Sequence, residues 1–229
     1  DTEECRVRVG AGATCAAVQH AAAAAGLVFG VDLASRDSAT VGGMASTNAG
    51  GLRTVRYGNM REQILGLEVA LPDGSLVRRH SQVRSDNTGY DLTSLFVGAE
   101  GTLGVITGLD LRLYPTPPHR VTAVAGFDDL DALITTGRRF RDTDGIAALE
   151  LVDARGSTLT AEHLGVAAPV DGAWQLLIEM AGDTDQTELL ASALEDAELV
   201  GDRPRGDVRR AQRRGRGRRG GATRGVFRR

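Results

Sequence analysis

The stretch SATVGGMASTNAGGLRTVRYGN, from Ser38 to Asn59, constrains the fold most, because five of its residues are glycine. The pairs Gly42–Gly43 and Gly50–Gly51 permit positive φ angles and leave no Cβ atom where another group must approach the backbone. Short hydroxyl and amide side chains lie among them: Thr40, Ser46, Thr47 and Asn48. Successive N–H groups in such a loop form a nest that suits an anionic diphosphate. The stretch is therefore either a turn between strands or one side of a ligand site, and its spacing alone does not decide.

A second stretch, NTGYDLTSLFVGAEGTLGVIT, runs from Asn87 to Thr107 and also contains closely spaced glycines. Its segment Glu100–Gly104 predicts a tight turn that leads directly into a strand. The free N–H and C=O groups of that strand are suited to the edge of a purine, and Glu100 can accept a hydrogen bond from a hydroxyl or a backbone amide. The presence of both stretches favours a ligand site over a plain connection.

The residues around these stretches predict a unit of strands and short helices. Alternating apolar residues predict strands over 5–9 and 104–115. Thr14 is placed to cap a helix that Gly26 ends. We expect the second strand to point three leucines one way and two charged residues the other: Leu109, Leu111 and Leu113, then Asp110 and Arg112.

A hairpin is predicted over residues 64–79, with its turn at Pro72–Gly74. Residues 91–98 predict a short helical turn. We expect four apolar residues of the hairpin to share one face: Leu65, Leu67, Val69 and Leu71.

Three prolines, at positions 115, 117 and 118, predict a boundary between a first domain over 1–118 and a second over 119–200. A helix in the second domain begins after a capping residue, Asp128 or Asp129. The order strand–helix–strand, then strand–helix, without a Gly-rich phosphate loop, is typical of a small α+β sandwich. The expected segments are strands over 120–127, 146–153 and 173–182, with helices over 128–140 and 185–197.

The last residues differ sharply from the rest in charge. Residues 203–229 hold 12 of the 27 arginines and one of the 30 acidic residues, which gives formal charges of +11 there and −14 before it. Such a segment has too few apolar residues to fold, so we expect 201–229 to be a disordered tail or the product of a frameshift. Arg-Gly clusters also bind nucleic acid, but Phe227 is the one aromatic residue available for base stacking, and we expect no nucleic-acid partner.

Four segments together resemble a known superfamily: ATVGGMASTNAGGLRTVRYGN, LGLEVALPDGSLVR, DNTGYDLTSLFVGAEGTLGVIT and LRLYPTPP. They are similar to the flavin-dependent oxidases and dehydrogenases of the vanillyl-alcohol-oxidase/PCMH superfamily. Within it they resemble the branch of glycolate oxidase, D-lactate dehydrogenase and D-2-hydroxyglutarate dehydrogenase. The resemblance covers Val7 to Pro118 and thins over 119–200. It implies an α+β fold: the second subdomain of a PCMH-type FAD-binding domain, followed by a partial ferredoxin-like cap domain.

The resemblance implies FAD as the cofactor and oxidation of a 2-hydroxy acid, of the D-lactate, glycolate or D-2-hydroxyglutarate type, by hydride transfer to flavin N5. It implies contacts with the FAD diphosphate and ribityl chain from Asp32, Ser35, Thr40, Gly42 and Gly43. Beside the ribityl chain and isoalloxazine it places Ser46, Thr47, Asn48, Gly50, Gly51 and Gly58. At the adenosine end it places Glu100, Gly101, Thr102, Gly104, Val105 and Ile106. It assigns no catalytic residue.

This sequence also departs from the family pattern. The family has an N-terminal subdomain with its own Gly-rich diphosphate loop, and a longer cap with histidine-rich metal-binding residues; we expect both to be absent. Val31 stands where a proline is common, and Ser85 where a basic residue is common. We therefore expect weak or no FAD retention and no turnover by this chain alone. The alternatives are a non-catalytic fragment or remnant, a subunit whose missing half is encoded upstream, and a basic-tailed binding protein without flavin turnover.

Other classes of site find little support. The four histidines lack metal-ligand spacing, so we expect no metal site, and no Ser/His/Asp arrangement is evident. Arg53 and Arg56 fit either an anionic flavin or acid substrate, or a solvated, salt-bridged role.

Two cysteines, Cys5 and Cys15, are too few for a disulfide framework, and no apolar run reaches the roughly 18 residues of a membrane span. We expect a cytoplasmic protein without a membrane span, with peripheral association at the membrane as the alternative. Its expected partners are the 2-hydroxy acid substrate and an electron acceptor, which is a quinone, a cytochrome, an electron-transfer flavoprotein or oxygen.

Overall fold

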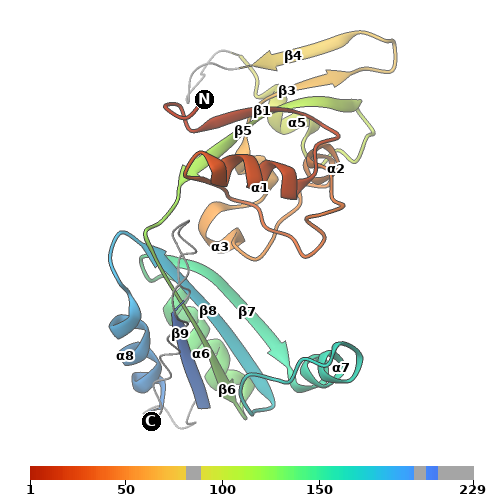
Figure 1. Ribbon diagram of the computed structural model, residues 1–229. Coiled ribbons are helices and arrows are strands. Elements are labelled where there is room, and N and C mark those ends of the chain that lie inside the picture. Colours follow the sequence, from red (N-terminus) through yellow and green to blue (C-terminus); the bar gives the residue numbers. More distant parts are fainter. Residues whose placement is uncertain (81–88, 199–204, 211–229) are drawn as a thin grey trace. The chain divides into compact units, whose positions relative to one another are not determined.

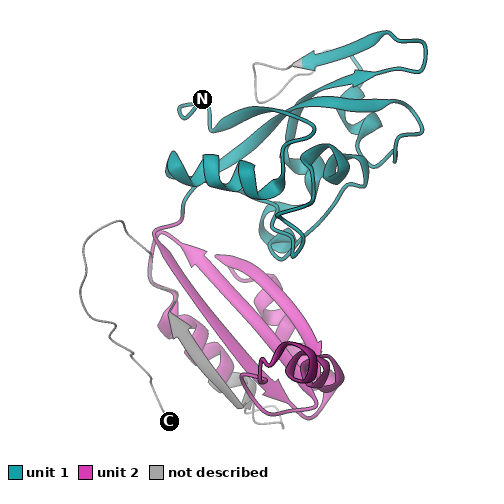
Figure 2. Cartoon of the chain, turned by 45° about the vertical axis from the view of Figure 1, so that its right-hand side comes forward, with its two compact units in different colours: residues 1–116 teal, residues 117–229 magenta. Residues whose placement is uncertain are grey.

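The computed structural model describes residues 1–80, 89–198 and 205–210, and the chain forms two compact units, 1–116 and 117–229 (Figure 2). One unit passes into the other between Thr116 and Pro117, inside the proline-containing segment noted above. Each unit has its own sheet and its own hydrophobic core. Within the described ranges, we find no helix with the length and hydropathy of a membrane span.

The sheet of the first unit is antiparallel and centred on its longest strand, β5 (Val105–Pro115). Strands β1 (Arg6–Gly10), β2 (Leu27–Phe29) and β3 (Ile64–Ala70) all pair with β5, and β4 (Leu76–His80) pairs with β3 (Figure 1). The helices are α1 (Cys15–Ala24), α2 (Val41–Ser46), α3 (Thr54–Tyr57), α4 (Met60–Gln63) and α5 (Leu92–Phe96).

Local signals in the sequence set the ends of several of these elements. Thr14 caps α1 by accepting a hydrogen bond from the amide of Ala17 at 3.2 Å. Gly26 follows the helix with a φ of 73°, a backbone conformation that favours glycine. Gly74, with a φ of 83°, closes the predicted turn between β3 and β4. These predictions are confirmed.

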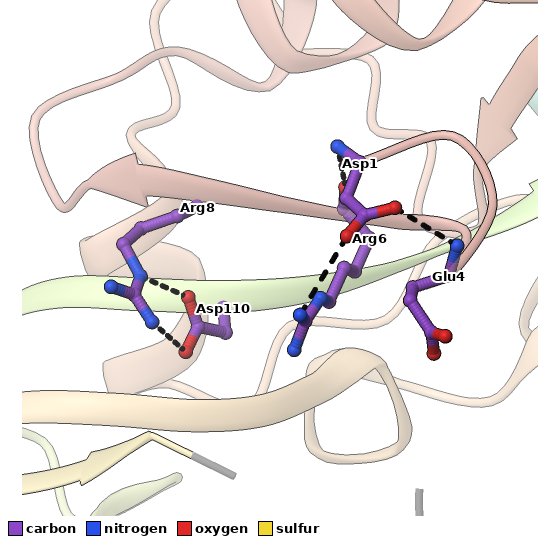
Figure 3. Close-up of polar contacts among 5 residues, drawn as sticks. All are labelled: Asp1, Glu4, Arg6, Arg8 and Asp110. Carbon is purple, nitrogen blue, oxygen red and sulfur yellow. Dashed lines mark hydrogen bonds and ion pairs between the residues drawn. The ribbon is translucent and has the colours of Figure 1, made fainter. Parts of the chain in front are cut away.

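The predicted alternation along β5 is also confirmed, with one addition. Leu109, Leu111 and Leu113 are buried, but Asp110 on the opposite face is only 3% exposed. Its carboxylate accepts two hydrogen bonds from Arg8 of β1, at 2.6 Å and 3.1 Å (Figure 3). Bidentate pairing of this kind holds the two strands in register and raises the pKa of the Arg8 guanidinium.

The predicted buried face of β3 is wrong at its first position. A register shift between Ile64 and Gly66 bulges the strand, so that Ile64 enters the core and Leu65 does not. Beyond the bulge, Leu67 and Val69 are fully buried as predicted. A β-bulge reverses which face a residue occupies, and simple alternation in the sequence carries no sign of it.

The second unit has the order β–α–β–β–α–β of a ferredoxin-like fold, with one further helix, α7, between its second and third strands. The sheet order is β7-β8-β6-β9, with antiparallel pairing throughout. Helices α6 and α8 contact the sheet and each other, and Leu133, Phe140 and Leu190 are buried in the same core. Asp129, not Asp128, caps α6 through the amide of Ala132. The elements are β6 (His119–Phe127), α6 (Leu130–Arg141), β7 (Ile146–Asp153), α7 (Ala154–Leu164), β8 (Trp174–Gly182), α8 (Thr187–Glu198) and β9 (Arg205–Arg210).

Strand β9 corrects one expectation from the sequence. Residues 205–210 are not disordered: they pair with β6 from Val121 to Gly126 and provide the fourth strand of the sheet. The expectation failed because pairing at a sheet edge uses backbone N–H and C=O groups, which any sequence without proline supplies. The rest of the arginine-rich segment, and the idea of a frameshift within it, lie outside the described residues.

Helix α7 was not predicted. It begins at the cap Asp153, which accepts from the amide of Gly156, and ends at Gly165 with a φ of 67°. None of its residues is buried. An exposed helix without an apolar stripe gives no helical period, so the caps are the only sequence signals for it.

Candidate functional site

The structure brings the two glycine-containing stretches together through backbone hydrogen bonds. The amide of Gly98 donates to the carbonyl of Ala45, and the amide of Glu100 donates to the carbonyl of Ser46, both at 3.0 Å. The turn before β5 therefore lies against the end of α2. Residues more than 50 positions apart become neighbours, as expected if both stretches serve one site.

The first stretch is not only a loop, because its middle forms helix α2. Thr40 caps this helix and accepts from the amide of Gly43 at 3.3 Å. The amides of Val41 and Gly42 donate to the carbonyls of Ala13 and Ala11. These donors, which the sequence offered as a nest for a diphosphate, are thus already paired within the protein.

Several glycines of the first stretch are explained by packing inside the unit. A Cβ on Gly42 would lie 2.6 Å from the Cβ of Ala11, and one on Gly50 would lie 2.6 Å from the amide oxygen of Asn59. A Cβ on Gly51 would collide with the carbonyl group of Asp32. Gly58 adopts a φ of 78°. The close approach inferred from the sequence is real at Gly42, Gly50 and Gly51, but the group that approaches is another part of this chain.

Asp32 is buried and anchors the same region. Its carboxylate accepts from Gln19 at 3.2 Å and forms ion pairs with Arg36 at 2.9 Å and Arg53 at 3.6 Å. Burial, with the Asp32 charge as a second cause, raises the pKa of the nearby Cys15 thiol. Asp32 therefore fixes the loop around it rather than presenting a free carboxylate.

Of the two arginines singled out in this stretch, Arg53 follows the salt-bridged alternative. Arg53 pairs with Asp32, and the guanidinium of Arg56 lies 5.4 Å from the ring centroid of Tyr57, within the range of a cation–π interaction. Tyr57 in turn packs against Tyr114, with ring centroids 4.6 Å apart.

The remaining polar residues of the first stretch lie at the surface or in its turns. Ser35 and Thr47 are exposed, and the Thr47 hydroxyl donates to the carbonyl of Gly43 at 3.1 Å. Asn48 has a φ of 50°, and its side-chain oxygen accepts from the amide of Arg61 at 2.9 Å. Ser46 is half-buried beside the second stretch.

The turn Glu100–Gly104 is the part most open to a ligand. Glu100 and Gly101 have φ angles of 50° and 78°, and no atom lies within 4 Å of a Cβ built on Gly101. Thr102 is exposed, and its hydroxyl donates to the carbonyl of Ala99. Within the described part of the chain, the amides of Gly101, Leu103 and Gly104 have no hydrogen-bond partner.

The last two residues predicted to contact FAD, at the start of β5, differ in burial. Val105 is 65% exposed, whereas Ile106 is 9% exposed and packs in the core. Leu103 is 42% exposed and adds a second apolar side chain at the surface. Because the side chain of Ile106 is buried in the core, this residue can contact a ligand only through its backbone atoms.

Two residues that the sequence did not single out hold these pieces in place. Gln63 is fully buried, and its side-chain amide donates to the carbonyls of Tyr57 and Asn59. Arg61 donates to the carbonyls of Ser94 and Val97. Neither has a sequence signature, since each binds backbone carbonyls that any residue carries. No cluster of His, Cys, Asp and Glu suited to a metal ion occurs among the described residues.

Comparison with known proteins agrees with this picture. Residues 1–79 match the FAD binding domain family, and residues 116–227 match the family of FAD linked oxidases, C-terminal domain. The second match includes both β9 and the arginine-rich residues after it.

Two curated relatives of this chain are named as hydroxy-acid dehydrogenases or oxidases. Mitochondrial D-2-hydroxyglutarate dehydrogenase of Bos taurus is 42% identical over 160 residues, which are 69% of this chain and 29% of that protein. The GlcD subunit of glycolate oxidase from Bacillus subtilis is 35% identical over 71% of this chain and 35% of its own length. The chain thus spans about a third of the length of these relatives.

The structure of alkyldihydroxyacetonephosphate synthase superposes with a TM-score of 0.71 at 16% identity, over 89% of this chain and 41% of that one, and shows a shared fold. The α+β fold implied by the resemblance is confirmed by this match and by the two domain matches. The chain therefore belongs to the FAD-linked oxidases with a PCMH-type FAD-binding domain, a family whose cofactor is FAD.

Proposed function

We propose that this chain forms one wall of the FAD site of an enzyme that oxidises a 2-hydroxy acid of the D-2-hydroxyglutarate, D-lactate or glycolate type. The observation that carries the proposal is the joining of α2 to the turn Glu100–Gly104, which leaves the outer side of that turn open. The names of the relatives supply the class of substrate. When bound, FAD accepts a hydride from the substrate carbon at N5, and the electrons pass on to an acceptor.

The described residues fit FAD in part. The turn offers three unpaired amides for the cofactor's oxygens or purine edge, and Leu103 and Val105 offer an apolar surface beside them. By contrast, the amides at the start of α2 and the carboxylate of Asp32 are occupied within the protein. The turn before β5 therefore carries more of the binding than the glycine pairs of the first stretch.

Two carboxylates of the first unit, Asp73 and Asp91, are poorly suited to proton transfer. A general base for the substrate hydroxyl works best with a pKa near neutrality. Hydrogen bonds from Ser75 and Ser94 instead lower the pKa of Asp73 and of Asp91, which moves both carboxylates away from that range. Asp73 and Asp91 are therefore poor candidates for the base that removes the hydroxyl proton. In this proposal the second unit is the substrate (cap) domain.

Titrating FAD into the purified 229-residue chain tests the binding role. We expect weak, saturable binding, seen as a change in flavin fluorescence, without a stoichiometric yellow protein absorbing near 450 nm. Gly101→Val is the matched variant, because it fills the open space at the turn and strains a positive φ. Equal FAD affinity of Gly101→Val and wild type would place the cofactor elsewhere, and a stoichiometric flavoprotein would overturn the expectation of a partial site.

The activity requires a separate test. The chain is mixed with the product of any upstream reading frame that encodes a Gly-rich diphosphate loop, and dye reduction is measured with D-2-hydroxyglutarate, D-lactate and glycolate. Turnover that needs both polypeptides supports a split enzyme. If the FAD-loaded mixture reduces no dye with any of the three, the proposed substrate class is wrong and a non-catalytic remnant is favoured.

A further inference from the structure

Arg61, on the short helix α4, connects three segments of the first unit. Its amide donates to the side-chain oxygen of Asn48 at 2.9 Å. Its guanidinium donates through one nitrogen to the carbonyl of Ser94 and through another to that of Val97, the second bond being 2.7 Å long. One residue thereby ties the middle of the first stretch, at Asn48, to the residues just before Gly98.

The position of Gly98 makes this arrangement tight. Gly98 has a φ of 82°, and a Cβ built on it would lie 3.3 Å from a guanidinium nitrogen of Arg61 and 3.4 Å from the Cβ of Asn48. The amide of Gly98 already donates a hydrogen bond to the carbonyl of Ala45. The chain therefore enters the turn Glu100–Gly104 from a point held on one side by α2 and on the other by Arg61.

The guanidinium is held by carbonyl groups rather than by a carboxylate. No ion pair joins Arg61 to an acidic residue within the described ranges, although its charge contributes weakly to the lowered pKa of Asp91. A planar guanidinium donates in fixed directions from nitrogens held apart, whereas the three donors of a lysine ammonium all sit on one nitrogen. The bridge thus depends on the shape of arginine and not only on its charge.

We propose that Arg61 is a positioning residue for the FAD site: it clamps the segment Ser94–Gly98 against Asn48 and so holds the open amides of the turn Glu100–Gly104 in place. The inference rests on the proposed function, because the turn matters only if it binds the cofactor. Arg61 itself does not touch the turn's open side; it acts through the backbone that leads into it.

The test compares Arg61→Met and Arg61→Lys with wild type, using hydrogen–deuterium exchange over residues 94–106 in the FAD-free chain and FAD affinity in titration. Both variants are expected to speed exchange in this segment and to weaken FAD binding about tenfold, as expected for losing bonds from a charged donor to buried carbonyls. Lysine is expected to fail like methionine; restored affinity in Arg61→Lys would show that charge alone suffices and would overturn the clamp. Arg112→Met, an arginine of β5 outside these contacts, is the control and should change neither readout.

Gly98→Ala disturbs the same contacts by placing a Cβ 3.3 Å from the guanidinium of Arg61, and it should also speed exchange although Arg61 is unchanged. Unchanged exchange in all of these variants would overturn the inference whatever FAD does. Faster exchange with unchanged FAD affinity would also overturn it, because the clamp would then not serve the cofactor. If wild type binds no FAD, the binding role proposed for this chain by itself fails, and the exchange data still decide whether the clamp exists.

Discussion

Gly51→Ala separates the two explanations for the glycines of the first stretch. If Gly51 is glycine because a ligand approaches it, the variant should fold normally and lose only ligand binding. The structure predicts the opposite. A Cβ at this position collides with the carbonyl oxygen of Asp32 and lies 2.9 Å from its carbonyl carbon and 3.1 Å from its amide nitrogen. These are backbone atoms, so no side-chain rotation relieves the contact.

The size of the effect follows from two contributions. Overpacking of a tight site costs about 1–3 kcal/mol, and displacing Asp32 also breaks the bond from the Leu52 amide to its carbonyl, worth about 1 kcal/mol. We therefore expect Gly51→Ala to lower the free energy of unfolding by about 3 kcal/mol. With an m-value of roughly 2 kcal/mol/M in urea, the unfolding midpoint falls by about 1.5 M.

The assay is urea unfolding without FAD, followed by near-ultraviolet circular dichroism, for which the paired rings of Tyr57 and Tyr114 report on this unit. Gly43→Ala is the matched control, because Gly43 is exposed and its Cβ would meet only the Thr40 hydroxyl, at 3.2 Å. Alanine is favoured over glycine in a helix, so this control should be as stable as wild type or slightly more so. Equal midpoints for the two variants would refute the packing explanation.

Three further outcomes are expected. Hydrogen bonds from Ser94 hold the pKa of Asp91 below its usual range, so the capping of α5 by Asp91 stabilises the fold above the unfolded-state pKa of about 4. This stability is lost as the pH falls through the lower folded pKa, so the difference between wild type and Asp91→Asn in urea unfolding should shrink from pH 7 to pH 3; a constant difference would contradict this. Thr14→Ala removes the α1 cap and should cost about 1 kcal/mol in thermal unfolding, whereas no loss would show that the cap is not needed. A chain ending at residue 210 should melt like the full chain by the fluorescence of Trp174, while one ending at residue 200 should melt earlier for want of β9; identical melting of both would argue against the fourth strand.

Signals confined to a few neighbouring residues were predictable from the sequence. Thr14 and the pair Asp128 or Asp129 indicate helix starts because capping needs only a side chain within three residues of the amide it binds. Gly26 indicates a helix end because its positive φ favours glycine. The alternation along β5 was predictable for the same reason, since period-two burial is a local property of a strand.

Features that depend on distant backbone could not be predicted. Gly42 and Gly51 were correctly identified as points of close approach, but the approaching groups, Ala11 and Asp32, leave no mark in the local sequence. The roles of Arg61 and Gln63 were missed because their partners are main-chain carbonyls. Strand β9 was missed because its pairing with β6 requires no apolar side chains.

The two glycine-containing stretches are joined by bonds between main-chain atoms, from Gly98 to Ala45 and from Glu100 to Ser46. Such a joint uses no side-chain atoms, so the half-buried position 46 can change without dismantling the framework, whereas Ala45 is buried and Glu100 has a φ of 50°. In the site proposed above, Ser46 is therefore the position where variants can change the polarity while the backbone joint persists. Gly98 is constrained as well, since its φ of 82° favours glycine and a Cβ would lie 3.3 Å from a guanidinium nitrogen of Arg61.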